Sequence, residues 1–215
     1  MDKLLKLKQL YTLKMFGEEY FEGFLVKDDE ITNMPEELRE LNKMVQNCHR
    51  CNLSKTRKNV VFGEGNPDAE IMFIGEAPGR EEDLQGRPFV GKSGDMVTKM
   101  IQKVLLLKRE DVYIANIIKC RPPQNRNPEI EEIDACKGYL LKQIEIIKPK
   151  IIVLLGNIAL HSLLNLNIGI TKARGKLYDF NGIKVIPTFH PSYLLRNPSK
   201  KLETLQDLKF IKELL

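Results

Sequence analysis

The stretch Ile71-Met72-Phe73-Ile74-Gly75-Glu76-Ala77-Pro78-Gly79 (residues 71–79) decides the fold class, because a short apolar run stops at a turn that is rich in glycine and proline. An apolar run of this length between turn signals is consistent with a fully buried strand. Comparable β-rich runs recur at residues 112–118, 151–155 and 185–189. The chain therefore has four candidate strands.

Helical patterns lie between these runs, at residues 94–107, 128–147 and 158–164, and a last one lies near 203–215. Buried strands separated by helices predict a mainly parallel sheet that is covered on both faces. We therefore expect an α/β protein with three α/β/α layers around a central four-stranded, mainly parallel sheet.

Polar or glycine-rich residues stand at the end of every candidate strand. Glu76 follows the first run, Asn116 lies near the end of the second, Gly156-Asn157 follow the third and His190 follows the fourth. Ligands bind outside the carboxyl ends of the strands in sheets of this kind. The sequence predicts that these residues converge at one edge of the sheet.

The cysteines of the chain, Cys48, Cys51, Cys120 and Cys136, form two pairs that are far apart in sequence. This spacing predicts one metal centre that ties distant segments together. Four thiolates suit either a zinc ion or an iron-sulfur cluster. The alternative is four unrelated buried thiols. A disulfide framework is less expected, because cysteines are few and nothing marks the chain as secreted.

The composition is that of an ordinary soluble protein: 215 residues, 42% hydrophobic, 29% charged and a net charge of +5. This modest positive charge permits contact with a polyanion without demonstrating it. No apolar run approaches the roughly 20 residues that span a bilayer. We expect an intracellular location and no membrane partner. Abundant Lys, Ile and Glu without Trp are also consistent with a thermophile.

Residues 1–34 form a lysine-rich amphipathic stretch, which we interpret as an N-terminal extension that is helical. A helix then begins near Pro35 and brings Cys48 and Cys51 to its end. We expect the second region, residues 35–215, to be the functional domain. The extension could pack on it, bind a polyanion or dock a partner protein; packing is our preferred interpretation.

Several motifs together resemble one known family. The segments GEAPGREED, RPFVGKSG, NIIKCRPPQNRNP and HPSYLLR, with the cysteine spacing, are similar to the family 4 uracil-DNA glycosylases, the thermostable iron-sulfur branch of the uracil-DNA glycosylase superfamily. The likeness runs from about Pro35 to the C-terminus. It implies an enzyme of base excision repair that hydrolyses the N-glycosidic bond of uracil in single- or double-stranded DNA and leaves an abasic site.

Such a reaction needs a pocket, because a stacked base must be rotated out of the duplex. The resemblance implies that Phe89 is the platform on which uracil stacks. Asn116 is the natural specificity residue, because its side-chain amide matches the N3–H donor and O4 acceptor of uracil. The resemblance points to Glu82 as the residue that excludes the methyl group of thymine.

Uracil leaves as an anion, and a hydrogen bond from His190 to its O2 atom would stabilise that charge. The water nucleophile is less defined, because better-known uracil glycosylases carry an aspartate where this chain has Ala77. Glu76 is the nearest carboxylate, and backbone groups of the turn from Ala77 to Gly79 could hold the water with it. We therefore name Glu76 and His190 as the catalytic candidates.

Further residues are candidates for contact with DNA. The segment after His190 resembles an intercalation loop, in which apolar side chains fill the gap left by the rotated base. Basic side chains and helix N-termini suit phosphates. The predicted DNA-binding residues are Lys92, Ser93, Arg121, Leu194, Leu195 and Arg196. Leu194 and Leu195 could instead begin a buried helix.

The resemblance implies a structural 4Fe-4S cluster on the four cysteines, with zinc as the less expected occupant, and a monomer. Three other functions compete with the glycosylase. A covalent DNA-trapping relative would need a histidine that residues 80–88 lack. A zinc-stabilised nucleic-acid-binding module would leave Asn116 and HPSYLLR unexplained. An electron-transfer protein would need no pocket with asparagine and histidine.

Overall fold

The computed structural model describes residues 33–215. The extension predicted for residues 1–34 therefore lies outside the described residues, except for its last two. Asn33 is exposed, whereas Met34 is 5% exposed and packs against the core. Among the described residues, no helix is both long enough and apolar enough to span a bilayer.

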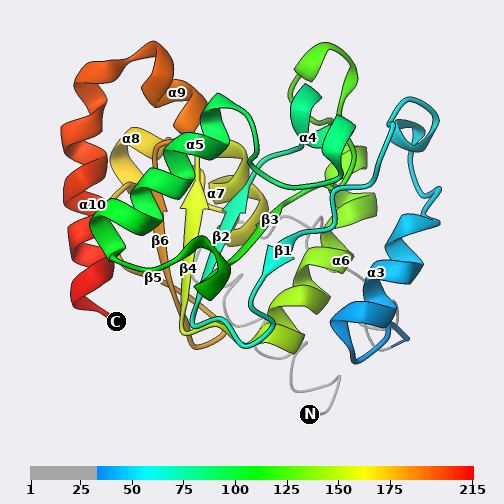
Figure 1. Cartoon of the computed structure of the whole chain (residues 1–215), viewed down its shortest axis with the longest axis horizontal. Coiled ribbons are helices and arrows are strands. Elements are labelled where there is room, and N and C mark those ends of the chain that lie inside the picture. Colours follow the sequence, from blue (N-terminus) through cyan, green and yellow to red (C-terminus); the bar gives the residue numbers. More distant parts are fainter. Residues whose placement is uncertain (1–32) are drawn as a thin grey trace, which may run out of the picture.

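A six-stranded sheet forms the middle layer, in the order β1-β3-β2-β4-β6-β5 (Figure 1). Its four inner strands run parallel: β2 (Ile71–Gly75), β3 (Tyr113–Asn116), β4 (Ile151–Leu155) and β6 (Ile183–Thr188). The edge strands β1 (Glu64–Gly65) and β5 (Tyr178–Phe180) pair antiparallel to β3 and β6. The prediction of a mainly parallel α/β sheet is confirmed, but the sheet has six strands and not four.

The alternating side chains of β2 show how one strand serves two cores. Met72 and Ile74 pack into one hydrophobic cluster, whereas Ile71 and Phe73 pack into the other. All four are at most 1% exposed. Burial of each such side chain is worth about 1.5–3 kcal/mol. Because both faces of β2 are buried, the strand has an uninterrupted apolar sequence and not the alternation of apolar and polar residues that a half-buried strand shows.

Helices cover both faces of the sheet (Figure 1). The cluster around Phe73 packs against the helices of one face, which are α5 (Lys92–Lys99), the π-helical segment η3 (Met100–Leu105), α9 (Pro191–Arg196) and α10 (Lys201–Glu213). The cluster around Met72 packs against those of the other, which are α3 (Leu38–Gln46), α6 (Ile130–Ile147) and α7 (Asn157–Leu164). The expected three-layer arrangement is thus present.

The helix boundaries differ from the sequence prediction in instructive ways. The helix expected at 94–107 begins earlier, at Lys92, and becomes a π-helical segment before Leu106, whose φ is 60°. Helix α9 contains Leu194 and Leu195, for which a helix was the alternative prediction. The other short helices were not predicted: α4 (Arg80–Gln85), α8 (Ile170–Ala173) and the 3₁₀ turns η2 (Asn52–Lys55), η4 (Arg109–Asp111), η5 (Pro123–Asn125) and η6 (Pro198–Lys200). Helices of one or two turns are too short to show periodicity.

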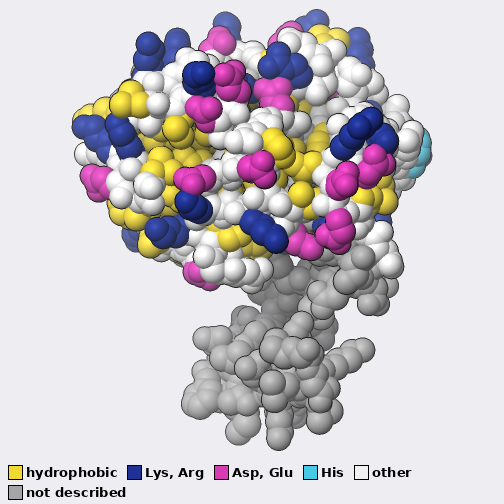
Figure 2. All heavy atoms as spheres, turned by 60° about the horizontal axis from the view of Figure 1, so that its bottom comes forward, with side chains coloured by type: hydrophobic (Ala, Val, Ile, Leu, Met, Phe, Trp, Pro, Cys, Tyr) yellow, Lys and Arg dark blue, Asp and Glu magenta, His cyan; other side chains and the backbone are white. Residues whose placement is uncertain are grey.

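The carboxyl ends of the inner strands point to the top of Figure 1, where α4, α9 and the start of α5 lie. Figure 2 turns the opposite end of the molecule toward the viewer, and there Lys and Arg side chains alternate with Asp and Glu. The residues that follow the strands, among them Glu76, Asn157 and His190, lie at the upper edge, as the sequence predicted.

Candidate active site

A cavity of about 530 Å³ lies at the carboxyl ends of the inner strands, and we call it the strand-end cavity. Its volume falls in the range of roughly 300–1,000 Å³ that is typical of small-molecule sites. Ten of the predicted site residues line it: Glu76, Ala77, Gly79, Glu82, Phe89, Lys92, Ser93, Asn116, His190 and Arg196. Arg121, Leu194 and Leu195 are not in its lining.

Phe89 has an unusual backbone conformation. Its φ is 49°, in the left-handed region that a non-glycine residue enters at a cost of order 1–3 kcal/mol. The first turn of α5 packs directly on it, because a Cβ atom on Gly94 would lie 1.9 Å from the Phe89 carbonyl oxygen. Only glycine fits at that position. The fold thus holds a strained aromatic residue against the cavity.

Asn116 ends β3 opposite Gly75 of β2 and is 1% exposed. Within residues 33–215, its Oδ1 atom is the one buried side-chain oxygen or nitrogen without a hydrogen-bond partner. A buried acceptor without a partner costs about 1–3 kcal/mol. Because Asn116 lines the strand-end cavity, this acceptor can be satisfied by a ligand with an N–H group.

His190 caps the N-terminus of α9. Its Nδ1 atom accepts a hydrogen bond from the backbone N–H of Ser192 at 3.1 Å and lies 2.7 Å from the Ser192 hydroxyl. Burial, and then the charge of Arg196, lowers the pKa of His190 to about 4. The ring is therefore neutral at pH 7, and the cap leaves its proton on Nε2. Its ring centre lies 5.9 Å from that of Phe89.

The two carboxylates of the first motif are in different environments. Burial raises the pKa of Glu76, and no hydrogen bond or ion pair to its carboxylate occurs within residues 33–215. Glu82 is fully engaged: Oε2 accepts from Gly79 N–H and Oε1 from Val90 N–H, both at 3.1 Å. Glu82 therefore joins the first motif to the Phe89 loop, and the Gly79 amide is occupied by Glu82.

The predicted DNA-binding residues fall into two groups. Lys92 and Ser93 form the first turn of α5 at the cavity, where unpaired N–H groups favour an anion. Leu194 is fully buried, whereas Leu195 is 41% exposed, so Leu195 is the leucine that α9 presents to solvent. Arg121 donates a 2.7 Å hydrogen bond from Nε to Asn125 Oδ1 within its own loop.

The four cysteines line one small cavity between α3, η2, the loop after β3 and α6. Burial raises the pKa of Cys136 to about 12 and also raises that of Cys120, so these two would stay protonated at pH 7 unless a metal binds them. As they stand, no three His, Cys, Asp or Glu side chains of the described chain are close enough to hold a single ion.

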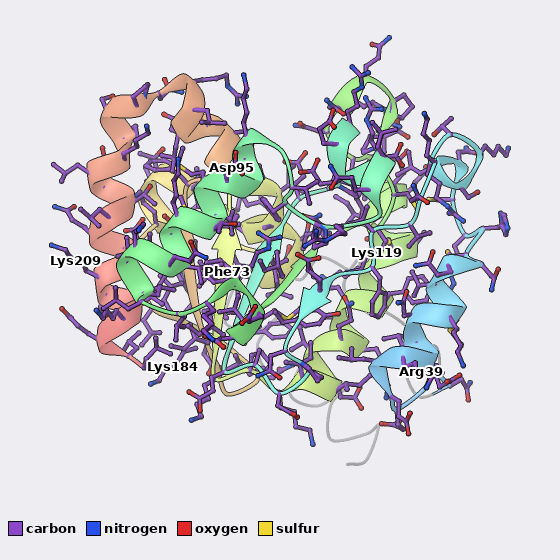
Figure 3. All side chains as sticks on the ribbon, in the orientation of Figure 1. Arg39, Phe73, Asp95, Lys119, Lys184 and Lys209 are labelled. Carbon is purple, nitrogen blue, oxygen red and sulfur yellow. The ribbon has the colours of Figure 1, made fainter. Side chains whose placement is uncertain are left out.

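One side chain and one backbone N–H donate hydrogen bonds to cysteine sulfurs in this cavity. Arg57 Nη1 donates to Cys120 Sγ at 3.3 Å, and the backbone N–H of Lys119 donates to Cys136 Sγ at 3.3 Å. The Lys119 side chain is 1% exposed and lies between the end of β3 and α6 (Figure 3). Hydrogen bonds of this kind stabilise metal-bound thiolates. The donor set therefore suits a four-cysteine metal centre in its chemistry and location, whereas the side chains as they stand do not surround a single ion.

The sequence reasoning missed one wall of the strand-end cavity. Pro122, Asn125, Arg126 and Asn127 line it from the loop between β3 and α6. Arg126 is anchored by a bidentate pair with Glu132, at 2.8 and 2.6 Å. The segment RPPQNRNP, whose polar residues follow the end of a strand, could have indicated this wall. Of its residues, only Arg121 was predicted to contact DNA. Asn157 and Tyr193 also line the cavity. Asn157 was predicted to lie at this edge of the sheet, but neither residue was given a role.

Comparisons with known proteins agree with this geometry. Residues 62–212 match the model of the family described as the uracil DNA glycosylase superfamily. A type-4 uracil-DNA glycosylase of Thermotoga maritima is 51% identical, covering 81% of this chain and 93% of that protein. One from Saccharolobus solfataricus is 49% identical, covering 80% and 83%. The chain therefore belongs to the uracil-DNA glycosylase superfamily and, within it, to the type-4 branch.

Proposed function

We propose that this chain removes uracil from DNA by hydrolysing the N-glycosidic bond. The observation that carries the proposal is the unpaired Oδ1 atom of buried Asn116, which lines a cavity together with Phe89 and His190. An amide that is buried without a partner and still faces a cavity is a recognition group for a ligand that supplies the missing donor.

Recognition follows from the polarity of the Asn116 amide. Its oxygen would accept the N3–H of uracil, and its nitrogen would donate to O4. Cytosine presents an acceptor at N3 and a donor at C4, so it opposes both contacts. Phe89 supplies a face for stacking, since bases stack on aromatic rings regardless of sequence. We propose that Glu82 limits the space near C5, although both of its oxygens also brace backbone N–H groups.

In the proposed reaction, a water oxygen bonds to C1′ of the deoxyribose while the bond from C1′ to N1 breaks. The electron pair of that bond stays with the departing uracil, whose O2 accepts a hydrogen bond from His190 Nε2–H. Removal of one such donor typically costs about 10²–10³ in kcat. Glu76 orients the water and takes up its proton. Its unpaired carboxylate and raised pKa support this role.

The DNA strand would lie across the same rim. The N-terminal turn of α5, with Lys92 and Ser93, suits a phosphate next to the extruded nucleotide. Leu195, exposed on α9, suits insertion into the space left in the base stack. Arg196 lines the cavity and suits an adjacent phosphate. We assign these contacts to DNA that is single- or double-stranded.

We further propose that Cys48, Cys51, Cys120 and Cys136 hold a structural 4Fe-4S cluster. When bound, it would supply cross-linking of remote segments and no chemistry on uracil. Colour separates the occupants, because zinc has a filled d shell and gives a colourless protein. A brown preparation with iron and acid-labile sulfide supports the cluster; a colourless one that contains zinc overturns it.

An oligonucleotide with a single uracil tests the activity. After incubation with the protein, hot alkali cleaves the strand wherever an abasic site has formed. We expect cleavage with wild type, and strong loss in Asn116→Ala and His190→Ala. The matched control is His161→Ala, since His161 lies on α7, contacts the Ile168 carbonyl oxygen in the loop after that helix and does not line the cavity. Absence of cleavage by wild type in both single- and double-stranded substrates would refute the proposal.

We also propose that the protein acts inside a prokaryotic cell as a monomer. The roles suggested for residues 1–34, packing or docking of a repair or replication partner, remain predictions from sequence.

A further inference from the structure

We propose that Arg109 is a positioning residue that, together with Glu64, clamps the strained Phe89 loop and thereby sets the stacking platform for uracil. The inference rests on the proposed function, because it assumes that Phe89 stacks on the base. Arg109 belongs to η4 and does not line the strand-end cavity. It would act on the reaction only through the backbone that carries Phe89.

The contacts of the Arg109 guanidinium carry the inference. Nη2 donates to the Pro88 carbonyl oxygen at 2.6 Å, directly before Phe89. Nε and Nη2 also donate to Glu64 Oε1 at 3.0 and 2.8 Å, and Nη1 donates to Thr98 Oγ1 at 3.1 Å. One rigid, partly buried cation thus ties edge strand β1 and helix α5 to the carbonyl that precedes Phe89.

The Phe89 loop needs such an anchor because its backbone is strained. Phe89 has a φ of 49°, a conformation that persists only where the surroundings over-determine it. The surroundings do so from three sides: Arg109 holds the carbonyl before Phe89, Glu82 holds the N–H of Val90 after it, and Gly94 packs on its own carbonyl. Of the two side chains among these groups, that of Glu82 lines the cavity, whereas that of Arg109 does not.

The same ion-pair network offers a matched control. Arg87 donates from Nε to Glu64 Oε2 at 2.8 Å, whereas the side chain that donates to the Pro88 carbonyl within residues 33–215 is that of Arg109. Its side chain is 58% exposed, whereas that of Arg109 is 19% exposed. Arg87→Gln therefore removes an arginine from Glu64 and leaves the clamp on Pro88 in place. A role that is only electrostatic or structural would affect both variants.

A double-mutant cycle tests the clamp. Excision by wild type, Arg109→Gln, Phe89→Ala and the double variant is compared well below each melting temperature, together with inhibition by free uracil. We expect Arg109→Gln to lower kcat/KM about 10- to 100-fold, as a misplaced group does. We expect free uracil to bind about tenfold more weakly, the low end of a base–aromatic stack. Arg87→Gln should match wild type on both measures.

The decisive result concerns additivity. If Arg109 acts through Phe89, Arg109→Gln has little further effect in the Phe89→Ala background. Multiplying effects, or wild-type uracil inhibition in Arg109→Gln, would overturn the clamp. If Arg109→Gln does not fold, Thr98→Val loosens the same guanidinium and is judged by the same criteria. No loss in Phe89→Ala would overturn the clamp too, while the glycosylase proposal is decided separately by Asn116→Ala and His190→Ala.

Discussion

Substitution of Gly75 by alanine should disable the site with a single methyl group. Gly75 ends β2 between two of the predicted substrate contacts. An added Cβ atom would lie 2.4 Å from Cζ and 2.8 Å from Cε2 of Phe89, and 2.5 Å from Oδ1 of Asn116. Ordinary contacts between carbon atoms are about 3.5–4.0 Å, so the ring and the amide must each recede by about 1 Å.

The size of the effect follows from that displacement. A misplacement of about 1 Å at a catalytic site can cost about 10²-fold in rate, and we expect a loss of that order in kcat/KM. Overpacking a core costs about 1–3 kcal/mol. For a chain of this size, each kcal/mol lowers Tm by about 2–4 °C. Gly75→Ala should therefore stay folded at moderate temperature and yet excise uracil poorly.

The assay is cleavage of the single-uracil oligonucleotide, with Tm measured on the same preparations. Gly169→Ala is the control, because a Cβ atom at Gly169 meets nothing within 4 Å. It should keep wild-type kcat/KM. If Gly75→Ala were as active as wild type, then Phe89 and Asn116 would not need the positions that the fold gives them, and the proposed recognition geometry would be incorrect.

Three further outcomes are expected. Burial raises the pKa of Glu76 above its ordinary value, so kcat/KM of wild type should fall as the pH drops through that pKa. Glu76→Gln should have a lower kcat/KM that does not fall in this pH range. An unchanged fall at acid pH in the variant would contradict the role of Glu76. The pKa of His190 is lowered from 6.5 to about 4, so the folded protein should lose stability progressively as the pH falls from 6.5 toward 4, with no such loss above pH 6.5. The Tm of His190→Asn should therefore depend less steeply on pH in that window than the Tm of wild type. Equal slopes would contradict a buried neutral ring. Cys136→Ala should abolish visible absorbance and lower Tm, because a structural metal centre contributes directly to folding; full metal content in the purified variant would exclude Cys136 as a ligand.

The parts of the fold that the sequence predicted share one property, which is a local pattern. The strand at 151–155 and the helix at 128–147 are long or apolar enough to stand out. Edge strand β1 covers only Glu64–Gly65, too few residues for any period to appear. Its existence depends on pairing with β3, a contact that no local window contains.

The candidate site divides in the same way. Asn116 and His190 were predictable because each stands at a strand end, and parallel strands bring their carboxyl ends to one edge. The left-handed φ of Phe89 was not predictable, since nothing in RPFVG marks it. The link from Glu64 to Arg109 crosses 45 positions of sequence. Contacts of that kind are decided by tertiary packing, which is where the supporting structure of the site lies.

Two unfavourable features lie side by side at the end of the sheet, and their position argues for preorganisation. The unpaired acceptor of Asn116 and the strained backbone of Phe89 both face the strand-end cavity. Each would relax in a protein that had no use for it, unless the surroundings prevent relaxation. Here Gly75 leaves no room between them, and Arg109, Glu82 and Gly94 fix the loop. Under the proposed function, the free energy of folding would maintain these positions before the base enters, so that binding need not supply the reorganisation.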